Sequence, residues 1–312
     1  MPETAFLYAD AYLDHDTGYG HPERPQRLHA ILEAIAASDV DANLKRIAPR
    51  PATTDELALV HHPDHIEVIR AMSAQGGGRI GYDTPLSEAS YDIALLATGG
   101  VLTAVDAVLD GTAQRAFACG RPPGHHATPT QAMGFCLFNS IAIGARYAVR
   151  EKGLGRILIV DWDVHHGNGT QDAFYEDSDV FFFSIHQSPL YPGTGMARER
   201  GAGVGAGSTL NVPVPAGSVD EDYFRVFSEM LIPAAREFSP DLVMISAGFD
   251  AHEDDPLAGV NVTTEGFGTL TRLMRDIADE HCDGRIVSTL EGGYSLHGVS
   301  SSVVAHLEAL AE

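Results

Sequence analysis

The chain has 312 residues, with 20 Lys and Arg against 43 Asp and Glu, and therefore a formal net charge of −23 at pH 7. A chain this acidic excludes binding of DNA or RNA through a general basic surface, because phosphate contacts need clustered Lys and Arg. Long-range attraction instead favours cationic ligands, although a charge of this sign also serves solubility alone. Hydrophobic residues make up 44% and charged residues 20%, as is usual for a globular protein.

The sequence gives no sign of a membrane or secretory segment. No apolar run reaches about 18 residues, the length of a membrane span, so we expect no membrane insertion. The start, Met1-Pro2-Glu3-Thr4, lacks the basic residues and apolar stretch of a signal peptide. Cys119, Cys136 and Cys282 show no CxxC spacing and cannot all pair, so we expect a reduced, cytoplasmic setting.

Helices and buried strands alternate along the chain. Apolar residues spaced i, i+3, i+4, i+7 predict helices over 28–35, 223–234 and 267–277. Nearly continuous apolar runs predict parallel strands that are covered on both faces. These runs are 115–119, 156–160, 180–185, 241–246 and 285–290. The alternation predicts an α/β fold with an open, mostly parallel sheet, in one domain over residues 1–312.

A polar cluster accompanies the end of every one of the five predicted strands. The clusters are 120–127, 161–169, 184–186, 248–255 and 291–294. Binding sites of open α/β sheets form at the carboxyl ends of the strands. We therefore expect these five segments, far apart in the sequence, to meet in one site.

The densest of these clusters predicts a metal site. Asp161, Asp163 and His165 alternate, and an extended chain projects alternate residues to one face. Asp250 follows another predicted strand. Asp163, His165 and Asp250 would form a three-ligand set with open positions, as in catalytic zinc sites. An oxygen-rich set of this kind also suits Fe²⁺ or Co²⁺, and Asp161 would orient its neighbours.

Two further motifs carry groups for acid–base and oxyanion chemistry. Prolines and a glycine precede His125-His126 and stiffen a loop in which a neutral imidazole could act as a general base. Tyr294 follows two glycines and could donate to a developing oxyanion, although packing is the alternative role. Phe135 and Tyr191 are candidate aromatic walls, with core packing equally open.

The sequence contains three His-His pairs, and we assign two of them to the expected site. These are the pairs at 125–126 and 165–166. The pair at 61–62 precedes Pro63 at a helix start and follows no predicted strand, so we expect it to be structural or at the surface.

Five ordered motifs together resemble the zinc-dependent histone deacetylase superfamily, which includes the acetylpolyamine amidohydrolases. They are RPPGHHA, GFCLFNS, DWDVHHGNGTQ, SAGFDAHEDDPLAG and LEGGY. The resemblance runs from about Asp14 to the C-terminus, and the chain looks like a compact bacterial member of the class II type. It implies the arginase–deacetylase fold and hydrolysis of N-ε-acyl-lysine or of N-acyl amines.

The resemblance also implies roles for the residues that match its motifs. The implied zinc ligands are Asp163, His165 and Asp250. The implied catalytic residues are His125, His126, Tyr294, Asp161 and Asn168. The implied substrate-binding residues are Gly134, through its carbonyl, the tunnel walls Phe135, Tyr191 and Leu257, and the rim acid Asp83. A structural potassium ion is implied near Asp161, Asp163, His165 and Ser184, and Arg24 is the implied internal arginine of an acetate-exit route.

One position separates the members of the superfamily. Some have Asp where this chain has Asn168, and an amide cannot stabilise an imidazolium as a carboxylate does. We therefore expect a lowered pKa for His126. The class II members share the Asn, and the presence of Tyr294 predicts competence as a deacetylase.

Two classes of substrate are compatible with this amide hydrolysis. Residues 190–195 read LYPGTG, like the deacetylase loop, and residues 14–24 hold no long insertion of the kind that narrows polyamine sites. We therefore expect acylated lysine in peptides or proteins, with acetylated polyamines as the alternative. A non-catalytic acyl-lysine or metal-binding protein is a remote alternative, and we find no second set of metal ligands for an arginase-like enzyme. The sequence is compatible with an oligomer.

Overall fold

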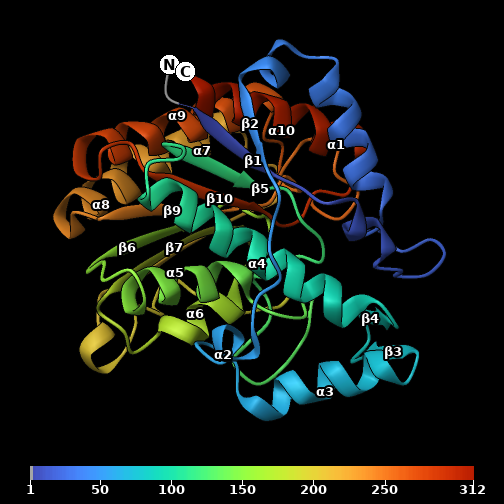
Figure 1. The fold of residues 1–312 in the computed structure, drawn as a ribbon. Helices are drawn as coiled ribbons and strands as arrows, with labels where there is room; N and C mark the ends of the chain where they lie inside the picture. The colour runs from blue at the N-terminus through green and yellow to red at the C-terminus, as the bar shows by residue number, and fades with distance from the viewer. Residues whose placement is uncertain (1–2) are drawn as a thin grey trace.

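An eight-stranded parallel sheet runs through the middle of the structure, a computed structural model that describes residues 3–312 (Figure 1). In spatial order its strands are β2 (Leu44–Ile47), β1 (Thr4–Leu7), β5 (Arg115–Ala118), β10 (Ile286–Leu290), β9 (Leu242–Ala247), β6 (Ile157–Asp161), β7 (Val180–Gln187) and β8 (Thr209–Val214). A separate antiparallel pair is formed by β3 (Gly77–Ile80) and β4 (Thr84–Ser87). The expected α/β fold with a mostly parallel sheet is confirmed.

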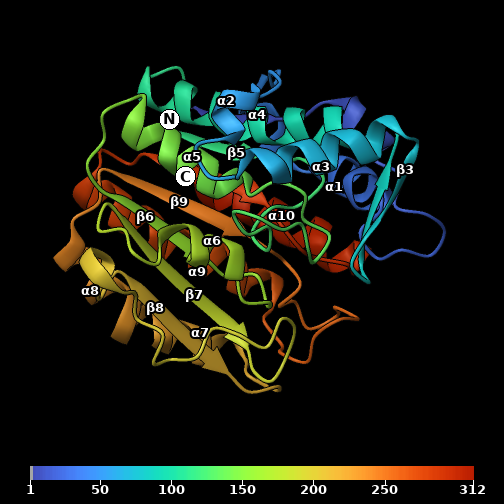
Figure 2. The same ribbon diagram turned by 90° about the horizontal axis from the view of Figure 1, so that it is seen from below.

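Helices cover both faces of the sheet, as Figure 2 shows. One face packs against α1 (Gln26–Ala36), α7 (Asp220–Val226), α8 (Ile232–Phe238), α9 (Thr264–His281) and α10 (Leu296–Ala311). The other packs against α2 (Thr54–Leu57), α3 (Pro63–Ala74), α4 (Ser90–Leu109), α5 (Ser140–Arg150) and α6 (Asn168–Phe174). Alternate residues of β6 enter the two cores, Leu158 and Val160 on one side and Ile157 and Ile159 on the other. Burial on both faces explains the continuous apolar runs.

The five predicted strands are present, and each lies within two residues of its expected bounds. The predicted helix over 223–234 is interrupted, because a π-helical turn at Phe227–Leu231 separates α7 from α8. Pro233 follows this turn near the start of α8, where it cannot donate a backbone hydrogen bond to the preceding turn.

The helix α4 has the length and composition of a membrane span. Among residues 3–312 it is the one helix long and apolar enough, by length and composition, to cross a membrane. In the fold it packs against α5 and β5, and its apolar residues belong to the core between these elements. Polar residues such as Asp92 and Asp106 interrupt its apolar sequence, so it contains no continuous apolar run of that length.

A buried charge network ties α1 to the loop after β5. The carboxylate of Glu23 is fully buried and accepts from Arg121, with Nη2 to Oε2 at 2.7 Å, and from Arg27, with Nη1 to Oε1 at 3.1 Å. Burial disfavours the charged carboxylate, but the two guanidinium groups prevail and lower the pKa of Glu23 to about 2. The network therefore holds its charges together in the folded state.

We predict that Glu23→Gln destabilises the fold by about 3–5 kcal/mol, because it leaves buried guanidinium groups without their carboxylate. Glu33→Gln, an exposed substitution on α1, should have little effect. Since the folded-state pKa of Glu23 lies below its ordinary value of 4.5, its contribution is complete above that value and is lost as the pH falls toward 2. Urea unfolding across this range measures both effects, and equal stability of the two variants would contradict the account.

Candidate active site

Loops at the carboxyl ends of the central strands bring the polar side chains together. Asp161 ends β6 and pairs with Ser246 of β9 on one side and Ser184 of β7 on the other. The turn after β6 carries Asp163 and His165, and the loops after β9 and β10 carry further groups. Parallel pairing places all these ends at the same edge, as expected from the sequence.

Asp163, His165 and Asp250 form a compact set of ligand atoms. One ligand atom from each residue lies within 4.8 Å of the other two. His165 Nδ1 is 3.1 Å from Asp163 Oδ1 and 3.0 Å from Asp250 Oδ2. Both carboxylates are buried, and His165 is only partly exposed. Among residues 3–312 this is the one set of three or more His, Cys, Asp or Glu with such spacing.

Backbone N–H groups fix the orientation of both carboxylates. Gly292 N donates to Asp163 Oδ2 and Val164 N donates to Asp250 Oδ1, each at 2.8 Å. The other oxygen of each carboxylate is thereby directed toward His165. Gly292 must be glycine, because a Cβ there would lie 2.1 Å from Asp250 Oδ2 and 2.5 Å from Asp163 Oδ2. Two oxygens and one nitrogen held in this way fit a divalent cation.

The electrostatics of the set favour a bound cation. Burial opposes the charged form of His165, yet its contacts with Asp163 and Asp250 raise the pKa of the imidazole to about 10. Burial and the neighbouring Asp163 raise the pKa of Asp250 to about 7. Both shifts report an excess of buried negative charge, which a divalent metal would neutralise.

The tandem histidines stand beside this set with different partners. His125 Nδ1 lies 2.9 Å from Asp161 Oδ2, and His126 Nδ1 lies 2.8 Å from Asn168 Oδ1. Burial opposes protonation of both, but the nearby Asp163 and Asp161 raise the pKa of His125 well above its ordinary value. The pKa of His126 is lowered, as expected, but burial and the neighbouring imidazoles dominate rather than the identity of Asn168.

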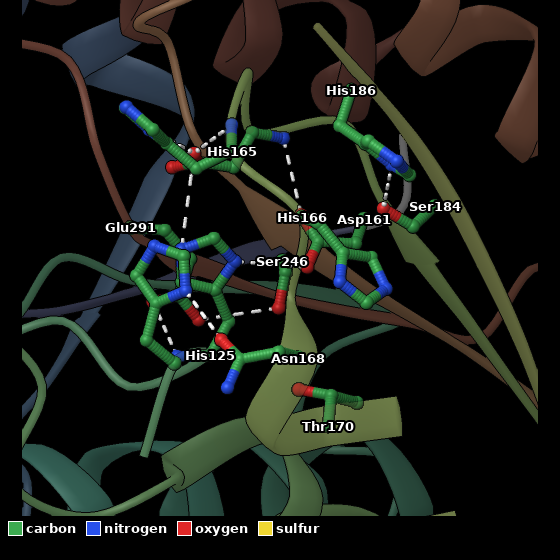
Figure 3. A network of polar contacts seen from close by, with 12 residues as sticks. His125, Asp161, His165, His166, Asn168, Thr170, Ser184, His186, Ser246 and Glu291 are labelled. Atoms are coloured by element: carbon green, nitrogen blue, oxygen red, sulfur yellow. Dashed lines mark hydrogen bonds and ion pairs between the residues drawn. The ribbon is translucent and has the colours of Figure 1, made fainter. Parts of the chain in front are cut away.

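Glu291 holds the histidine loop in place; it lies in the predicted cluster 291–294, but the sequence predicts no role for it. Its Oε2 accepts from Gly124 N at 2.7 Å and from His125 N at 3.1 Å. Its Oε1 accepts from Ser246 Oγ at 3.1 Å, so the carboxylate bridges three strand ends (Figure 3). Burial raises the pKa of Glu291 to about 7. The signal in the sequence that could have indicated its role is an acidic residue directly after a predicted apolar strand.

A cavity of about 230 Å³ opens at His126 and His165. Its lining residues are Asp83, His126, Gly134, Phe135, His165, Leu190, Tyr191, Leu257 and Tyr294. The Phe135 and Tyr294 rings lie edge to face with centroids 5.8 Å apart, and Tyr191 meets His126 at 90° with centroids 5.0 Å apart. All five residues that the resemblance implied for substrate binding therefore line this cavity, together with His165 of the ligand set.

Ser184 and His166 do not line the cavity, although Ser184 lies beside Asp161 on the neighbouring strand. Ser184 is buried on β7, with Oγ 2.9 Å from His186 Nδ1, and a potassium ion near it stays a prediction. His166, the second member of its His-His pair, contacts Thr194 Oγ1 at 2.8 Å and Gln171 Oε1 at 3.1 Å and does not line the cavity. The assignment of that whole pair to the site was wrong for His166.

The pair at 61–62 lies outside the cavity, as expected. His61 is buried, and its ring nitrogens contact Thr128 O at 3.0 Å and Asn139 N at 2.8 Å. His62 is exposed, and its ring nitrogen accepts from Asp64 N at the start of α3. These contacts are structural.

The internal arginine at the site is Arg27, not Arg24. Arg24 is only partly buried, whereas Arg27 is fully buried and donates from Nε to Gly293 O and from Nη2 to Glu291 O, both at 2.6 Å. Its guanidinium lies 5.1 Å from the centroid of the Tyr294 ring. The i, i+4 spacing from Glu23, which the structure shows as an ion pair, was the signal for Arg27.

Asp255 is a second residue of this kind: it lies in the predicted cluster 248–255, but the sequence predicts no role for it. Its Oδ2 accepts from Tyr294 N at 2.7 Å and from Ser295 N at 3.1 Å. Its Oδ1 accepts from Leu257 N at 3.0 Å. One buried carboxylate therefore fixes the backbone of both the candidate oxyanion donor and one wall of the cavity.

Comparisons with known proteins agree with this site. The family model for the histone deacetylase domain matches residues 21–310. A probable deacetylase of Archaeoglobus fulgidus is 40% identical over 297 residues, 95% of this chain and 82% of that protein. A histone deacetylase-like amidohydrolase of Pseudomonas aeruginosa is 37% identical over 310 residues, 99% of this chain and 82% of that protein. The crystal structure of the HDA15 HD domain superposes with a TM-score of 0.95 at 38% identity, covering 99% of this chain and 88% of that one.

The chain belongs to the histone deacetylase family, and the resemblance read from its motifs is confirmed. As a member of this family it is a hydrolytic deacetylase. Similar proteins occur in archaea, bacteria and plants, so membership does not indicate a bacterial source.

We predict that Asp255→Asn lowers kcat by about tenfold or more, because an amide cannot accept from all three N–H groups and one or more buried donors lose a partner worth about 1–3 kcal/mol. Metal content should be unchanged, since Asp255 is not in the ligand set. Asp254→Asn, a substitution of the exposed neighbour, is the matched control. Steady-state kinetics with metal analysis decides, and turnover of Asp255→Asn equal to the control would refute the role.

Proposed function

We propose that the protein is a metal-dependent hydrolase that removes acetyl or other short acyl groups from the ε-amino group of lysine in peptides or proteins. The observation that supports this most directly is the content of one cavity. His165 of the ligand set, His126 and Tyr294 line it together with the aromatic side chains Phe135 and Tyr191. A metal ligand, a base and an oxyanion donor thus share one narrow space.

The donor set suits zinc, with Fe²⁺ or Co²⁺ as further candidates. A metal held by Asp163, His165 and Asp250 would polarise the acyl carbonyl and lower the pKa of a water molecule. A structural potassium ion beside Asp161 and Ser184 is part of the same proposal.

His126 is the proposed general base. With Nδ1–H donating to Asn168 Oδ1 at 2.8 Å, its Nε2 stays free to accept a proton. Its lowered pKa, caused by burial and neighbouring imidazoles, keeps it neutral before the reaction. His126 takes a proton from the attacking water and later delivers it to the leaving amine. His125, paired with Asp161, provides positive charge beside it.

Tyr294 is the proposed donor to the tetrahedral oxyanion. The bond from Tyr294 N–H to Asp255 and the bond from Arg27 to the Gly293 carbonyl fix the peptide group that precedes Tyr294. Edge-to-face contact with Phe135 orients its ring. A donor held in place before the reaction needs no reorganisation as the charge develops.

The walls of the cavity suit an acyl-lysine side chain. Phe135, Tyr191 and Leu257 offer apolar surface to the neutral aliphatic chain. The Gly134 carbonyl would accept the amide N–H, and Asp83 would hold substrate backbone at the rim. An acetylated polyamine carries a further ammonium group, and Asp83 is the one acid among the residues that line the cavity in the described part of the chain. Acyl-lysine is therefore the favoured substrate.

The cysteines support a proposal for the cellular compartment of the protein. Cys119, Cys136 and Cys282 are all free and buried, which supports a reduced, cytoplasmic environment.

We predict that Tyr294→Phe and His126→Ala each lower kcat on an acetyl-lysine peptide by about 100-fold or more, since each removes a group that acts in the transition state. His62→Ala, at the exposed member of the pair outside the cavity, should keep full turnover. Acetate release from metal-loaded enzyme is the measurement. Turnover near that of the wild type in either variant would exclude the corresponding role.

The same assay separates the two substrate classes. A higher kcat/KM for acetylputrescine or acetylspermidine than for the peptide would favour the polyamine alternative and refute the proposed substrate.

A further inference from the structure

Two tyrosines near the cavity mouth are fully exposed to solvent. The relative exposures of Tyr19 and Tyr82 are 110% and 99%, and the next large hydrophobic side chain, Val204, reaches 79%. Large aromatic side chains gain most from burial, so complete exposure of two of them calls for an explanation.

Glycine-built turns hold both aromatic rings outward. Tyr19 stands between Gly18 and Gly20, which have φ values of 88° and 77°, and His21 N donates to Gly18 O to close the turn. Tyr82 follows Gly81, with φ of 59°, at the tip of the β3–β4 pair. The left-handed glycines give each turn its sharp reversal and leave the ring pointing away from the fold.

The bases of the two turns meet at the wall of the cavity. His21 Nδ1 lies 2.9 Å from Glu23 O, and Nε2 lies 3.4 Å from Asp83 O, so the histidine bridges the two segments. The His21 ring also stands edge-on to Phe135 with centroids 4.6 Å apart. Asp83 and Phe135 both line the cavity. In Figures 1 and 2 the dark blue loop before α1 and the β3–β4 pair extend from the same side of the molecule.

We propose that Tyr19 and Tyr82 form an aromatic rim that binds the polypeptide on either side of the acylated lysine. This inference rests on the proposed function and assigns its substrate class. A small acetylated amine would be contained in the cavity and would not touch rings beyond the mouth. A polypeptide continues past the mouth, where the rigid tyrosine rings offer contact area at low entropic cost.

Asp83 and Asp16 add acceptors to the rim. Asp16 Oδ1 accepts from Gly18 N at 2.8 Å, which fixes it beside Tyr19, and Asp83 Oδ1 accepts from Thr84 Oγ1 at 2.9 Å. Carboxylates next to aromatic faces suit peptide N–H groups and the cationic side chains of lysine-rich segments. The alternation of acid and ring at the mouth therefore fits a peptide better than a compact amine.

The test compares a long and a short substrate in the double variants of the rim. One substrate is a nine-residue peptide with a central acetyl-lysine, and the other is acetyl-lysine blocked at both ends. In Tyr19→Ser/Tyr82→Ser we expect KM for the peptide to rise about 5-fold to 20-fold with kcat unchanged, from two exposed aromatic contacts. KM for the blocked amino acid should not change.

Two variants serve as controls. Tyr19→Phe/Tyr82→Phe keeps the rings and removes only the hydroxyl groups, so it should retain the peptide KM of the wild type. A higher KM in this variant would show that the hydroxyl groups, not the rings, bind the peptide. Val204→Ser removes an exposed hydrophobic side chain that does not line the cavity and should change neither substrate.

An unchanged peptide KM in the serine double variant would overturn the proposal. So would a rise in KM for both substrates, which would indicate a distorted cavity. A changed oligomeric state in analytical ultracentrifugation with unchanged KM would identify the rim as a self-association surface instead. If the wild type hydrolyses neither substrate, the proposed function fails, and anisotropy with a fluorescein-labelled form of the peptide still measures whether the rim binds it.

Discussion

Buried negative charge at the carboxyl ends of β6, β9 and β10 is the constraint on which the rest of the structure depends. Asp161, Asp163, Asp250 and Glu291 are all almost completely buried within these few strand ends. Removing a carboxylate from water is costly unless hydrogen bonds or opposite charges replace the solvent. The loops, glycines and histidines around these carboxylates supply the hydrogen bonds and charges that offset this cost.

Most of the hydrogen bonds to these buried carboxylates come from backbone N–H groups rather than from cationic side chains. Asp163 accepts from Gly292 N, Asp250 from Val164 N, and Glu291 from Gly124 N and His125 N. These donors lie on other loops, so each carboxylate ties one strand end to another, as Figure 3 shows for Glu291. What remains unbalanced is the charge at Asp163, His165 and Asp250, where a divalent cation fits.

Two buried arginines connect these strand ends to α1 through hydrogen bonds and ion pairs. Arg27 binds the carbonyls of Glu291 and Gly293, while Arg27 and Arg121 share the carboxylate of Glu23. Arg27 therefore holds the segment before Tyr294 directly, and Arg121 acts on it only through the carboxylate of Glu23 that the two arginines share. A tyrosine positioned in this way can serve as a donor without moving, which connects the packing of α1 to the proposed chemistry.

Whether an element or a site residue could be predicted from the sequence depended on the kind of interaction that holds it in place. The five central strands were predictable because both of their faces are apolar, and the ligand set because Asp and His alternate at a strand end. The strand β2 was not predicted because it lies at the edge of the sheet and is only partly buried, and β8 was missed because Pro213 is tolerated there only as part of an edge strand. The short strand β1 was not predicted either. The roles of Asp255 and Glu291 escaped prediction because most of their partners are backbone N–H groups, which leave no pattern in side chains.

The central claim is that the three converging side chains hold one divalent metal, and metal analysis of the purified protein tests it most directly. After loading with zinc and removal of excess, the account predicts about one zinc per chain in the wild type. Asp250→Asn, whose amide oxygen can still accept from Val164 N, should lose it, and the exposed substitution Asp254→Asn should retain it. Full zinc content in Asp250→Asn, or none in the wild type, would contradict the account.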